Sequence, residues 1–139
     1  MTVVDTNVVS ELMKRDPSAA VRRWALAGAA GELYTTSITL AEILCGIERL
    51  PDGERKELLR MTAEEVFAAF PGYVLPFDGE AARCYSSVVV SRERQGLATD
   101  AMDAQIAAIC RAHNAQLATR NGKDFEGTAI KVIDPWHDA

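Results

Sequence analysis

Short runs of β-branched and aliphatic residues alternate with longer segments of helical periodicity, and this alternation most constrains the fold. The apolar runs are predicted strands, and they lie at 2–4, 33–36, 73–75, 116–119 and 130–133. Helical patterns lie between them, at 6–14, 18–27, 39–50, 55–70, 78–94 and 100–113. Strands that alternate with helices favour right-handed crossovers and parallel pairing. The sequence therefore predicts an α/β fold with a central, mostly parallel five-stranded sheet and helices on both faces.

Turn and cap residues mark the boundaries of these segments. Gly28 to Gly31 predict a turn. Asp78 is a favoured N-cap, and Thr39 with Glu42 fits a capping box at the start of the third helix. Because the chain has no internal repeat, low-complexity tract or long linker, we expect residues 1–139 to form one domain.

The composition is that of an ordinary folded protein and excludes several classes. Hydrophobic residues make up 48% and charged residues 25% of the chain, which favours a packed core over disorder. The apolar stretches are far shorter than the roughly 20 residues that span a bilayer. Met1 to Val4 is too short for a signal peptide. We therefore expect a cytoplasmic protein with no membrane association.

The cysteines and histidines do not form a recognisable site. Cys45, Cys84 and Cys110 are widely spaced within apolar patterns, so neither a disulfide framework nor a zinc cluster is predicted. We expect all three to be reduced core residues. A Ser/His/Asp or Cys/His nucleophilic site would have to use His113 or His137, and both are expected at the surface.

The chain has more acidic than basic residues, and the positions of the acids decide what this excess means. A net charge of −5 argues against non-specific binding of nucleic acid, which relies on a basic surface. The excess acid is either an ordinary solvated surface or is partly gathered at a site for divalent cations.

Three acids stand where a strand ends or a helix begins. Asp5 directly follows the first predicted strand, and Glu42 and Asp103 lie near the starts of helices. Each has an ordinary explanation, as an N-cap, a capping-box partner or a favourable charge in a first helical turn. The same positions also fit a ligand site, because open parallel sheets bind ligands outside the carboxyl ends of their strands.

Two of these acids begin apolar helical stripes. Asp103 shares a helix face with Ile106 and Cys110, and Glu42 shares one with Cys45. Buried, unpaired carboxylates are unfavourable, and several at one sheet edge repel each other. A divalent cation would relieve both effects. Oxygen ligands without a nearby His or Cys suit Mg²⁺ or Mn²⁺ rather than zinc.

Four segments carry motifs that extend over most of the chain. They are 3–11 (VVDTNVVSE), 36–46 (TSITLAEILCG), 103–107 (DAQIA) and 117–125 (LATRNGKDF). In this order and spacing they resemble the motifs of VapC-type toxins, which are PIN-domain ribonucleases. The final Asp134-Pro135-Trp136 resembles the ending of the FitB-like branch. The resemblance implies a PIN-like fold, Mg²⁺- or Mn²⁺-dependent cleavage of RNA, and a partner antitoxin of the VapB type.

Residue by residue, the resemblance assigns Asp5, Glu42 and Asp103 to the metal site. The family often has a fourth acid where this chain has Asn121, which we include among the expected catalytic residues. An amide oxygen can still bind a cation or hold a metal-bound water. Asp124 lies one loop away, and which of Asn121 and Asp124 faces the metal stays open.

Thr6, Asn7 and Ser10 in the first motif are expected to support the metal ligands. For Thr6 and Ser10, helix capping or surface exposure is nearly as good an explanation.

Basic residues near the same edge are candidates to hold RNA phosphates. Arg120 and Lys123 are the first candidates, and Arg92 and Arg94 extend the track. The alternative for each is an ordinary surface charge.

The family resemblance also implies a homodimer. Apolar residues crowd the first two helices beyond what one small core requires, and we expect them to form the seam: Leu12, Met13, Trp24 and Leu26.

Two other folds do not fit the sequence, and a third interpretation stays open. A receiver module would need an aspartate after the third predicted strand, where Pro76 and Phe77 stand. A haloacid-dehalogenase-type phosphatase would need an aspartate at the position of Asn7. A PIN fold that has lost catalysis and only binds a partner stays open, because only an RNA-cleavage assay with Mn²⁺ and chelator separates it from an enzyme.

Overall fold

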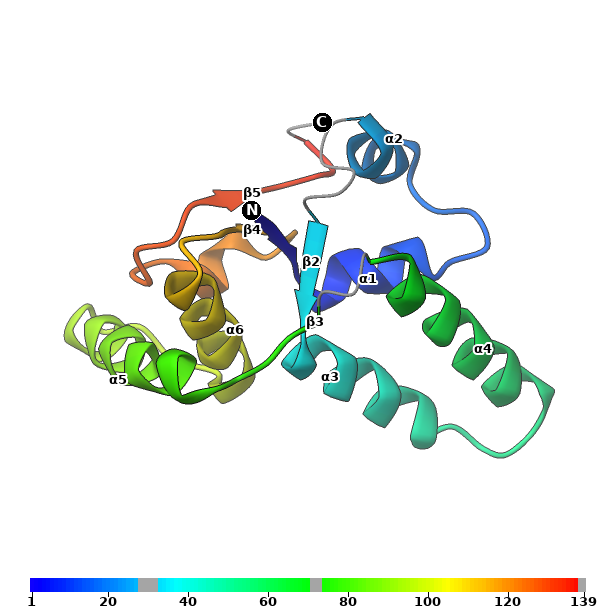
Figure 1. Ribbon diagram of the computed structural model, residues 1–139, viewed down its shortest axis with the longest axis horizontal. Helices are drawn as coiled ribbons and strands as arrows, with labels where there is room; N and C mark the ends of the chain where they lie inside the picture. The colour runs from blue at the N-terminus through cyan, green and yellow to red at the C-terminus, as the bar shows by residue number, and fades with distance from the viewer. Residues whose placement is uncertain (28–32, 71–73, 138–139) are drawn as a thin grey trace.

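The computed structural model describes residues 1–27, 33–70 and 74–137 (Figure 1). The strands are β1 (Thr2–Val4), β2 (Leu33–Thr36), β3 (Val74–Leu75), β4 (Gln116–Ala118) and β5 (Val132–Ile133). The helices are α1 (Thr6–Leu12), α2 (Ala19–Ala27), α3 (Ser37–Glu48), α4 (Glu54–Ala69), α5 (Gly79–Arg94) and α6 (Ala101–Ala112), with a 3₁₀ helix η1 (Gly122–Phe125). None of the helices in these ranges is long and apolar enough to cross a membrane.

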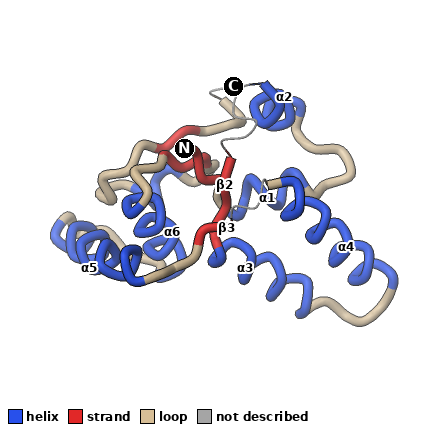
Figure 2. Tube along the Cα trace, viewed as in Figure 1, coloured by secondary structure: helices blue, strands red, loops and turns tan. Residues whose placement is uncertain are grey.

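The described strands, drawn in red in Figure 2, form one sheet in the order β3-β2-β1-β4-β5. Every pair is parallel, and the central strand β1 places Val3 opposite Tyr34 and Leu117. Because β1 has a neighbour on each side, the residue that follows it lies at the middle of the carboxyl edge. The predicted α/β class with a parallel five-stranded sheet is confirmed.

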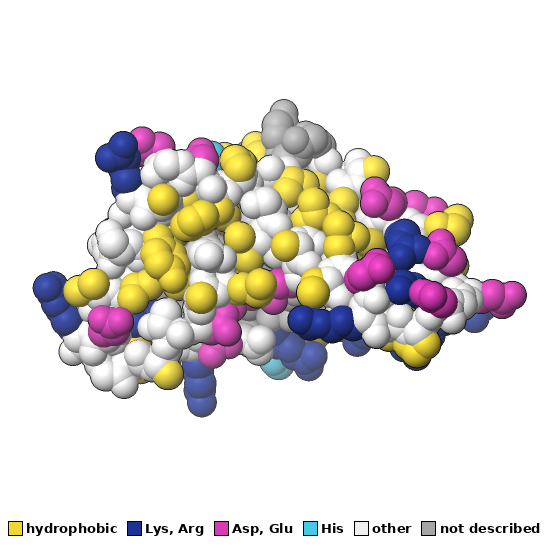
Figure 3. All heavy atoms as spheres, turned by 90° about the horizontal axis from the view of Figure 1, so that it is seen from below, with side chains coloured by type: hydrophobic (Ala, Val, Ile, Leu, Met, Phe, Trp, Pro, Cys, Tyr) yellow, Lys and Arg dark blue, Asp and Glu magenta, His cyan; other side chains and the backbone are white. Residues whose placement is uncertain are grey.

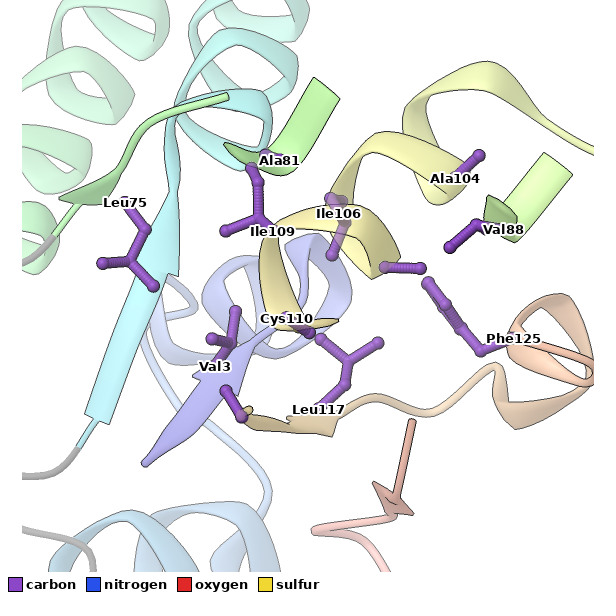
Figure 4. Close-up of a cluster of buried hydrophobic side chains, with 12 residues drawn as sticks. Val3, Leu75, Ala81, Val88, Ala104, Ile106, Ile109, Cys110, Leu117 and Phe125 are labelled. Carbon is purple, nitrogen blue, oxygen red and sulfur yellow. The ribbon is translucent and has the colours of Figure 1, made fainter. Parts of the chain in front are cut away.

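Helices pack on both faces of the sheet, and successive residues of β1 point to opposite faces. Val3 belongs to a core that α5 and α6 cover, and Figure 4 shows Val3 and Leu117 beside Cys110 of α6. Val4 belongs to a second core, formed with buried residues of α1, α2, α3 and α4. This alternation is expected for a strand that is buried on both sides. The predicted arrangement of helices is confirmed.

The third helix begins earlier than predicted. Thr36, not Thr39, is its N-cap, and the Thr36 side chain accepts a 3.0 Å hydrogen bond from the Thr39 amide. The capping box of Thr39 with Glu42 is therefore wrong, and Glu42 needs another explanation for its place. The Asp78 cap is confirmed by a 3.0 Å hydrogen bond from the Ala81 amide. The predicted turn at 28–31 lies outside the described residues.

The cysteines differ in burial. Cys110 is buried as predicted, and burial raises the pKa of its thiol to about 12. Cys84 is half-buried, whereas Cys45 is exposed, so the prediction of a core residue is wrong for Cys45. The reason is the orientation of α3, which turns Ile43 and Ile47 toward the core instead.

The apolar residues of the first two helices pack mainly within the chain. Leu12, Met13 and Trp24 contact the core beneath α1 to α4. Leu26 stays exposed, with 74% of its surface accessible. The expectation of a seam built on all four side chains is therefore weakened, and the homodimer stays a prediction.

Charges of both signs gather over the end of the molecule formed by α3 and α4 (Figure 3). Lys56, which is buried, contacts Glu48 and Asp52, and Arg60 contacts Glu48 and Glu57. These ion pairs join the loop-linked ends of α3 and α4, away from the carboxyl edge of the sheet.

Candidate metal and active site

The three predicted acids line one pocket at the carboxyl edge of the sheet. Asp5 follows β1, Glu42 lies on α3, and Asp103 lies in the first turn of α6. Together with Asn121 they border a cavity of about 450 Å³. Side chains from residues as far apart in the sequence as Asp5 and Asn121 thus meet at the place where parallel sheets bind ligands.

Asp5 is the N-cap of α1, which is one of the two roles that the sequence suggested. It caps α1, with the Thr6 amide donating a 2.8 Å hydrogen bond to Oδ1. Its other oxygen, Oδ2, accepts a 2.7 Å hydrogen bond from the Thr119 hydroxyl. Burial raises the pKa of Asp5 despite these two hydrogen bonds, and the charge of Asp124 adds to the rise. A buried carboxylate in this state favours a nearby cation.

Glu42 is held in the pocket by a contact with α1. The Thr6 hydroxyl donates a 2.9 Å hydrogen bond to Glu42 Oε1. The predicted apolar stripe of Glu42 with Cys45 is wrong, because that side of α3 is exposed beyond Glu42. Burial raises the pKa of Glu42, and the charges of Asp5 and Asp100 raise it further.

Of the three acids in the pocket, Asp103 has the most strongly shifted pKa. Its amide donates a 3.1 Å hydrogen bond to Asp100 Oδ1, the N-cap of α6, and the helix buries Ile106 and Cys110 on the predicted face. Desolvation by burial, followed by repulsion from Asp5 and other nearby carboxylates, raises the pKa of Asp103 to about 7. Near neutral pH its charge therefore depends on whether a cation is close.

The donor set fits a hard divalent cation. All three acids offer carboxylate oxygens, and burial raises the pKa of each, with the charges of neighbouring acids adding to the rise. Within the described ranges, no three His, Cys, Asp or Glu side chains are close enough to form a complete metal site by themselves. Mg²⁺ usually binds through one or two carboxylates and keeps several waters, so a wide acidic pocket suits it better than a closed cage.

Asn7 and Thr119 link the first motif to the end of β4. Asn7 Nδ2 donates a 3.1 Å hydrogen bond to Thr119 Oγ1, and Asn7 Oδ1 accepts one of 3.2 Å from the Arg120 amide. Thr119 Oγ1 also accepts a 3.1 Å hydrogen bond from the Asn121 amide. The predicted supporting place of Asn7 beside Asp5 agrees with these contacts.

The other candidate residues differ in whether they line the pocket. Thr6 contacts Glu42, and Ser10 lines the pocket with an exposed side chain. Asn121 lines the pocket, whereas Asp124 lies exposed on η1 and reaches the site through its charge. Lys123 is also exposed on η1 and does not line the pocket.

Arg92 cannot belong to the predicted phosphate track. It is buried, and its guanidinium donates hydrogen bonds to the carbonyl oxygens of Glu126 and Ala98. These hydrogen bonds hold two segments against α5: the one that precedes α6, at Ala98, and the one that follows η1, at Glu126. Arg94, by contrast, is exposed in the last turn of α5. The prediction for Arg92 is wrong because a long basic side chain in a helix can point inward when carbonyl oxygens receive it.

Sequence reasoning gave no role in the site to several residues that shape the pocket, among them Glu11, which lines it. Thr119 follows β4 as Asp5 follows β1, so its place at the carboxyl edge was a usable signal. Lys14 and Trp136 also line the cavity. Nothing in the spacing of Lys14 pointed to the site, whereas Trp136 closely follows the last strand.

Comparisons with known proteins agree with this geometry. Residues 2–131 match the PIN domain family. The VapC ribonuclease Y4jK of Sinorhizobium fredii is 39% identical over 100% of both chains. The toxin FitB of Neisseria gonorrhoeae is 32% identical over 99% of this chain and 100% of its own.

A solved structure shows the same fold. The crystal structure of FitAcB from Neisseria gonorrhoeae matches with a TM-score of 0.90 at 32% identity, covering 99% of each chain. The sequence resemblance is thereby confirmed over nearly the whole chain. With its parallel sheet, its acids at the carboxyl edge and these matches, the chain belongs to the PIN-domain family.

Proposed function

We propose that this protein is a divalent-metal-dependent endoribonuclease and the toxin of a toxin–antitoxin pair. The observation that carries the proposal is the pocket that Asp5, Glu42 and Asp103 share at the carboxyl edge of a PIN-type sheet. Relatives named VapC ribonuclease and toxin FitB, each at least 32% identical, support the reaction and the biological role.

The residues of the pocket have separate tasks in this proposal. Asp5, Glu42 and Asp103 would hold Mg²⁺ or Mn²⁺, with Asn121 able to orient a water by its amide. When bound, such an ion lowers the pKa of a water to supply hydroxide and stabilises the leaving oxygen of a phosphodiester. The Thr119 hydroxyl and the Thr6 amide orient the Asp5 carboxylate, and the Thr6 hydroxyl orients Glu42. Asp103 loses its proton more readily as positive charge approaches.

The proposal extends to assembly and place. We infer a single PIN domain over residues 1–139, a homodimer, a VapB-type antitoxin as partner, and a cytoplasmic location. Apolar side chains are spread over much of the face seen in Figure 3, which supports a protein partner on that side. Expression without the antitoxin should arrest growth, and co-expression with it should restore growth.

The direct test is cleavage of a single-stranded RNA by the purified protein. Activity should require Mn²⁺ or Mg²⁺ and disappear in chelator. Asp5→Asn and Asp103→Asn should each lower kcat/KM at least about a hundredfold, and the double variant should be no worse, because both acids serve one site.

The matched control is Asp16→Asn, which removes an exposed carboxylate outside the pocket and should keep parental activity. Asp5→Asn within about tenfold of the parent would contradict the metal-site assignment. A folded parent that cuts no RNA with either ion would favour the PIN fold that only binds a partner.

A further inference from the structure

Arg120 and Trp136 form a stacked pair on the wall of the acidic pocket. The guanidinium carbon of Arg120 lies 4.8 Å from the centre of the Trp136 ring, and both side chains line the cavity. Arg120 follows β4 and Trp136 follows β5. These strands are parallel neighbours that pair Ala118 with Ile133, so the sheet register brings the two side chains together.

Trp136 is a fixed part of the fold. Its half-buried ring packs against the core beneath α1 to α4. Its amide donates a 2.9 Å hydrogen bond to Asp134 Oδ1, and Pro135 between them is buried. The indole is therefore anchored from both its backbone and its side chain, and it gives the guanidinium a stable surface.

Arg120 has a fixed backbone and a side chain restrained by the ring. Its amide donates the 3.2 Å hydrogen bond to Asn7 described above. Its guanidinium forms no ion pair with any acid in the described ranges, although its charge helps to lower the pKa of Glu11. An exposed arginine has several free torsions, so a stacking partner strongly limits where its charge can lie.

For RNA to bind at the pocket, a positively charged side chain must lie where it can contact a backbone phosphate. Phosphates that approach Asp5, Glu42 and Asp103 are repelled by their charges unless positive groups lie close. Among the described lining residues, the cations are Lys14 and Arg120, and Lys14 already contacts Glu11 at 2.9 Å. Arg120 therefore remains available to a phosphate.

We propose that Trp136 is a positioning residue that holds Arg120 in place to bind a backbone phosphate of the RNA beside the acids. Trp136 itself does not touch the reacting atoms. A planar guanidinium binds two phosphate oxygens at once, and stacking fixes the plane of that fork before RNA arrives. The inference rests on the proposed ribonuclease activity and names the group that engages its substrate.

The test measures both RNA binding and RNA cleavage. Binding of a fluorescent single-stranded RNA is followed by anisotropy in chelator at several salt concentrations, and kcat and KM are measured with Mn²⁺. Arg120→Gln should weaken binding and raise KM about tenfold, with kcat changed little. The slope of log affinity against log salt should flatten by about 0.7, the value for one phosphate contact on a single strand.

Trp136→Leu removes no charge, yet it should change binding in the same direction and flatten the same salt slope. Trp136→Phe keeps a ring and should retain most of the affinity. Trp136→Leu combined with Arg120→Gln should be no worse than Arg120→Gln alone. Arg55→Gln, which removes an exposed charge in the first turn of α4, is the matched control and should bind as the parent does.

Additive effects of the two substitutions, or a salt slope that Trp136→Leu leaves unchanged, would overturn the proposal. If Trp136→Leu does not fold, Arg120→Lys decides instead: it keeps the charge, so the salt slope should persist while KM rises. A KM in Arg120→Lys equal to that of the parent would count against a guanidinium that is stacked on Trp136 and binds two phosphate oxygens. A parent that binds RNA through Arg120 without cutting it would leave this inference standing and refute the proposed activity. A parent that does not bind RNA would overturn both.

Discussion

The Thr6 hydroxyl donates a 2.9 Å hydrogen bond to Glu42 Oε1 and joins α1 to α3 across the acidic pocket. This hydrogen bond favours the charged form of Glu42, whereas burial and the neighbouring acids disfavour it. The position of the Glu42 carboxylate and the ease of its ionisation thus depend on one hydroxyl from another helix.

Replacing Thr6 should therefore change the titration of Glu42. In Thr6→Val the hydrogen bond is lost, so the pKa of Glu42 should rise above its already raised value. In the presence of Mn²⁺ the acid limb of the profile of kcat/KM against pH should move to higher pH. Thr6→Ser keeps the hydroxyl and is the control. Carbon-detected NMR of the Glu42 carboxyl in chelator measures the pKa directly, and equal values in the parent and Thr6→Val would refute this account.

Asp103 should make the metal-free protein less stable as the pH rises. Its pKa is about 7 in the folded protein against 3.8 in the reference state, so the folded state binds the proton more tightly. The unfolded chain therefore releases it first, and stability falls as pH rises between these values. In chelator, Tm should drop between about pH 4 and about pH 7, and Asp103→Asn should flatten this drop.

At about pH 8 the Tm of Asp103→Asn should exceed that of the parent by roughly 3 to 6 °C. Added Mg²⁺ should raise the parent's Tm and leave Asp103→Asn nearly unchanged, because the cation relieves the same repulsion. Asp16→Asn again serves as the comparison. An Asp103→Asn profile parallel to that of the parent would show that Asp103 does not carry the effect.

Asn121 offers a way to test the missing fourth acid. Asn121→Asp adds a carboxylate at the pocket wall, so the affinity for Mn²⁺ measured by calorimetry should increase several-fold. The added charge should also raise the pKa of Asp103 further in chelator. Asp124→Asn, on exposed η1, should weaken Mn²⁺ binding only slightly. The reverse order of effects would place Asp124 nearer the ion than Asn121.

Arg92 should matter for stability and not for RNA. Arg92→Met leaves the carbonyl oxygens of Glu126 and Ala98 without their charged donor, which should cost about 2 to 4 kcal/mol of unfolding free energy. Urea unfolding measures this loss. The dependence of RNA binding on salt should stay as in the parent, since a buried guanidinium releases no counterions from RNA. A flattened salt slope would restore Arg92 to the phosphate track.

The fold could be predicted largely because alternation and caps are local signals. β1 with Asp5 illustrates this, since an apolar strand followed by a capping acid is visible within residues 2–5. The start of α3 could not be placed from the sequence, because Thr36 and Thr39 are both good N-cap residues. In the structure β2 ends at Thr36, and α3 begins directly after it. The 3₁₀ helix η1 at Gly122–Phe125 has too short a pattern to be recognised.

The family motifs predicted which acids line the pocket, whereas the argument from apolar helix faces was correct for Asp103 and wrong for Glu42. The raised pKa of Asp103 follows from a buried helix face that the spacing showed. For Glu42 the stripe argument was wrong, and its place depends on a contact with Thr6 that no local pattern contains. The Arg120–Trp136 pair depends on the register of β4 with β5, which only the folded sheet defines.

The hydrogen bond between Thr119 and Asp5 joins residues 114 positions apart. The ribosome synthesises Asp5 long before Thr119. The acidic pocket therefore stays incomplete until Thr119 has left the exit tunnel and β4 has paired with β1. Parallel pairing over such a separation is slow compared with local helix formation. A growing chain that has not yet reached β4 therefore carries Asp5 without the hydroxyl that orients its carboxylate.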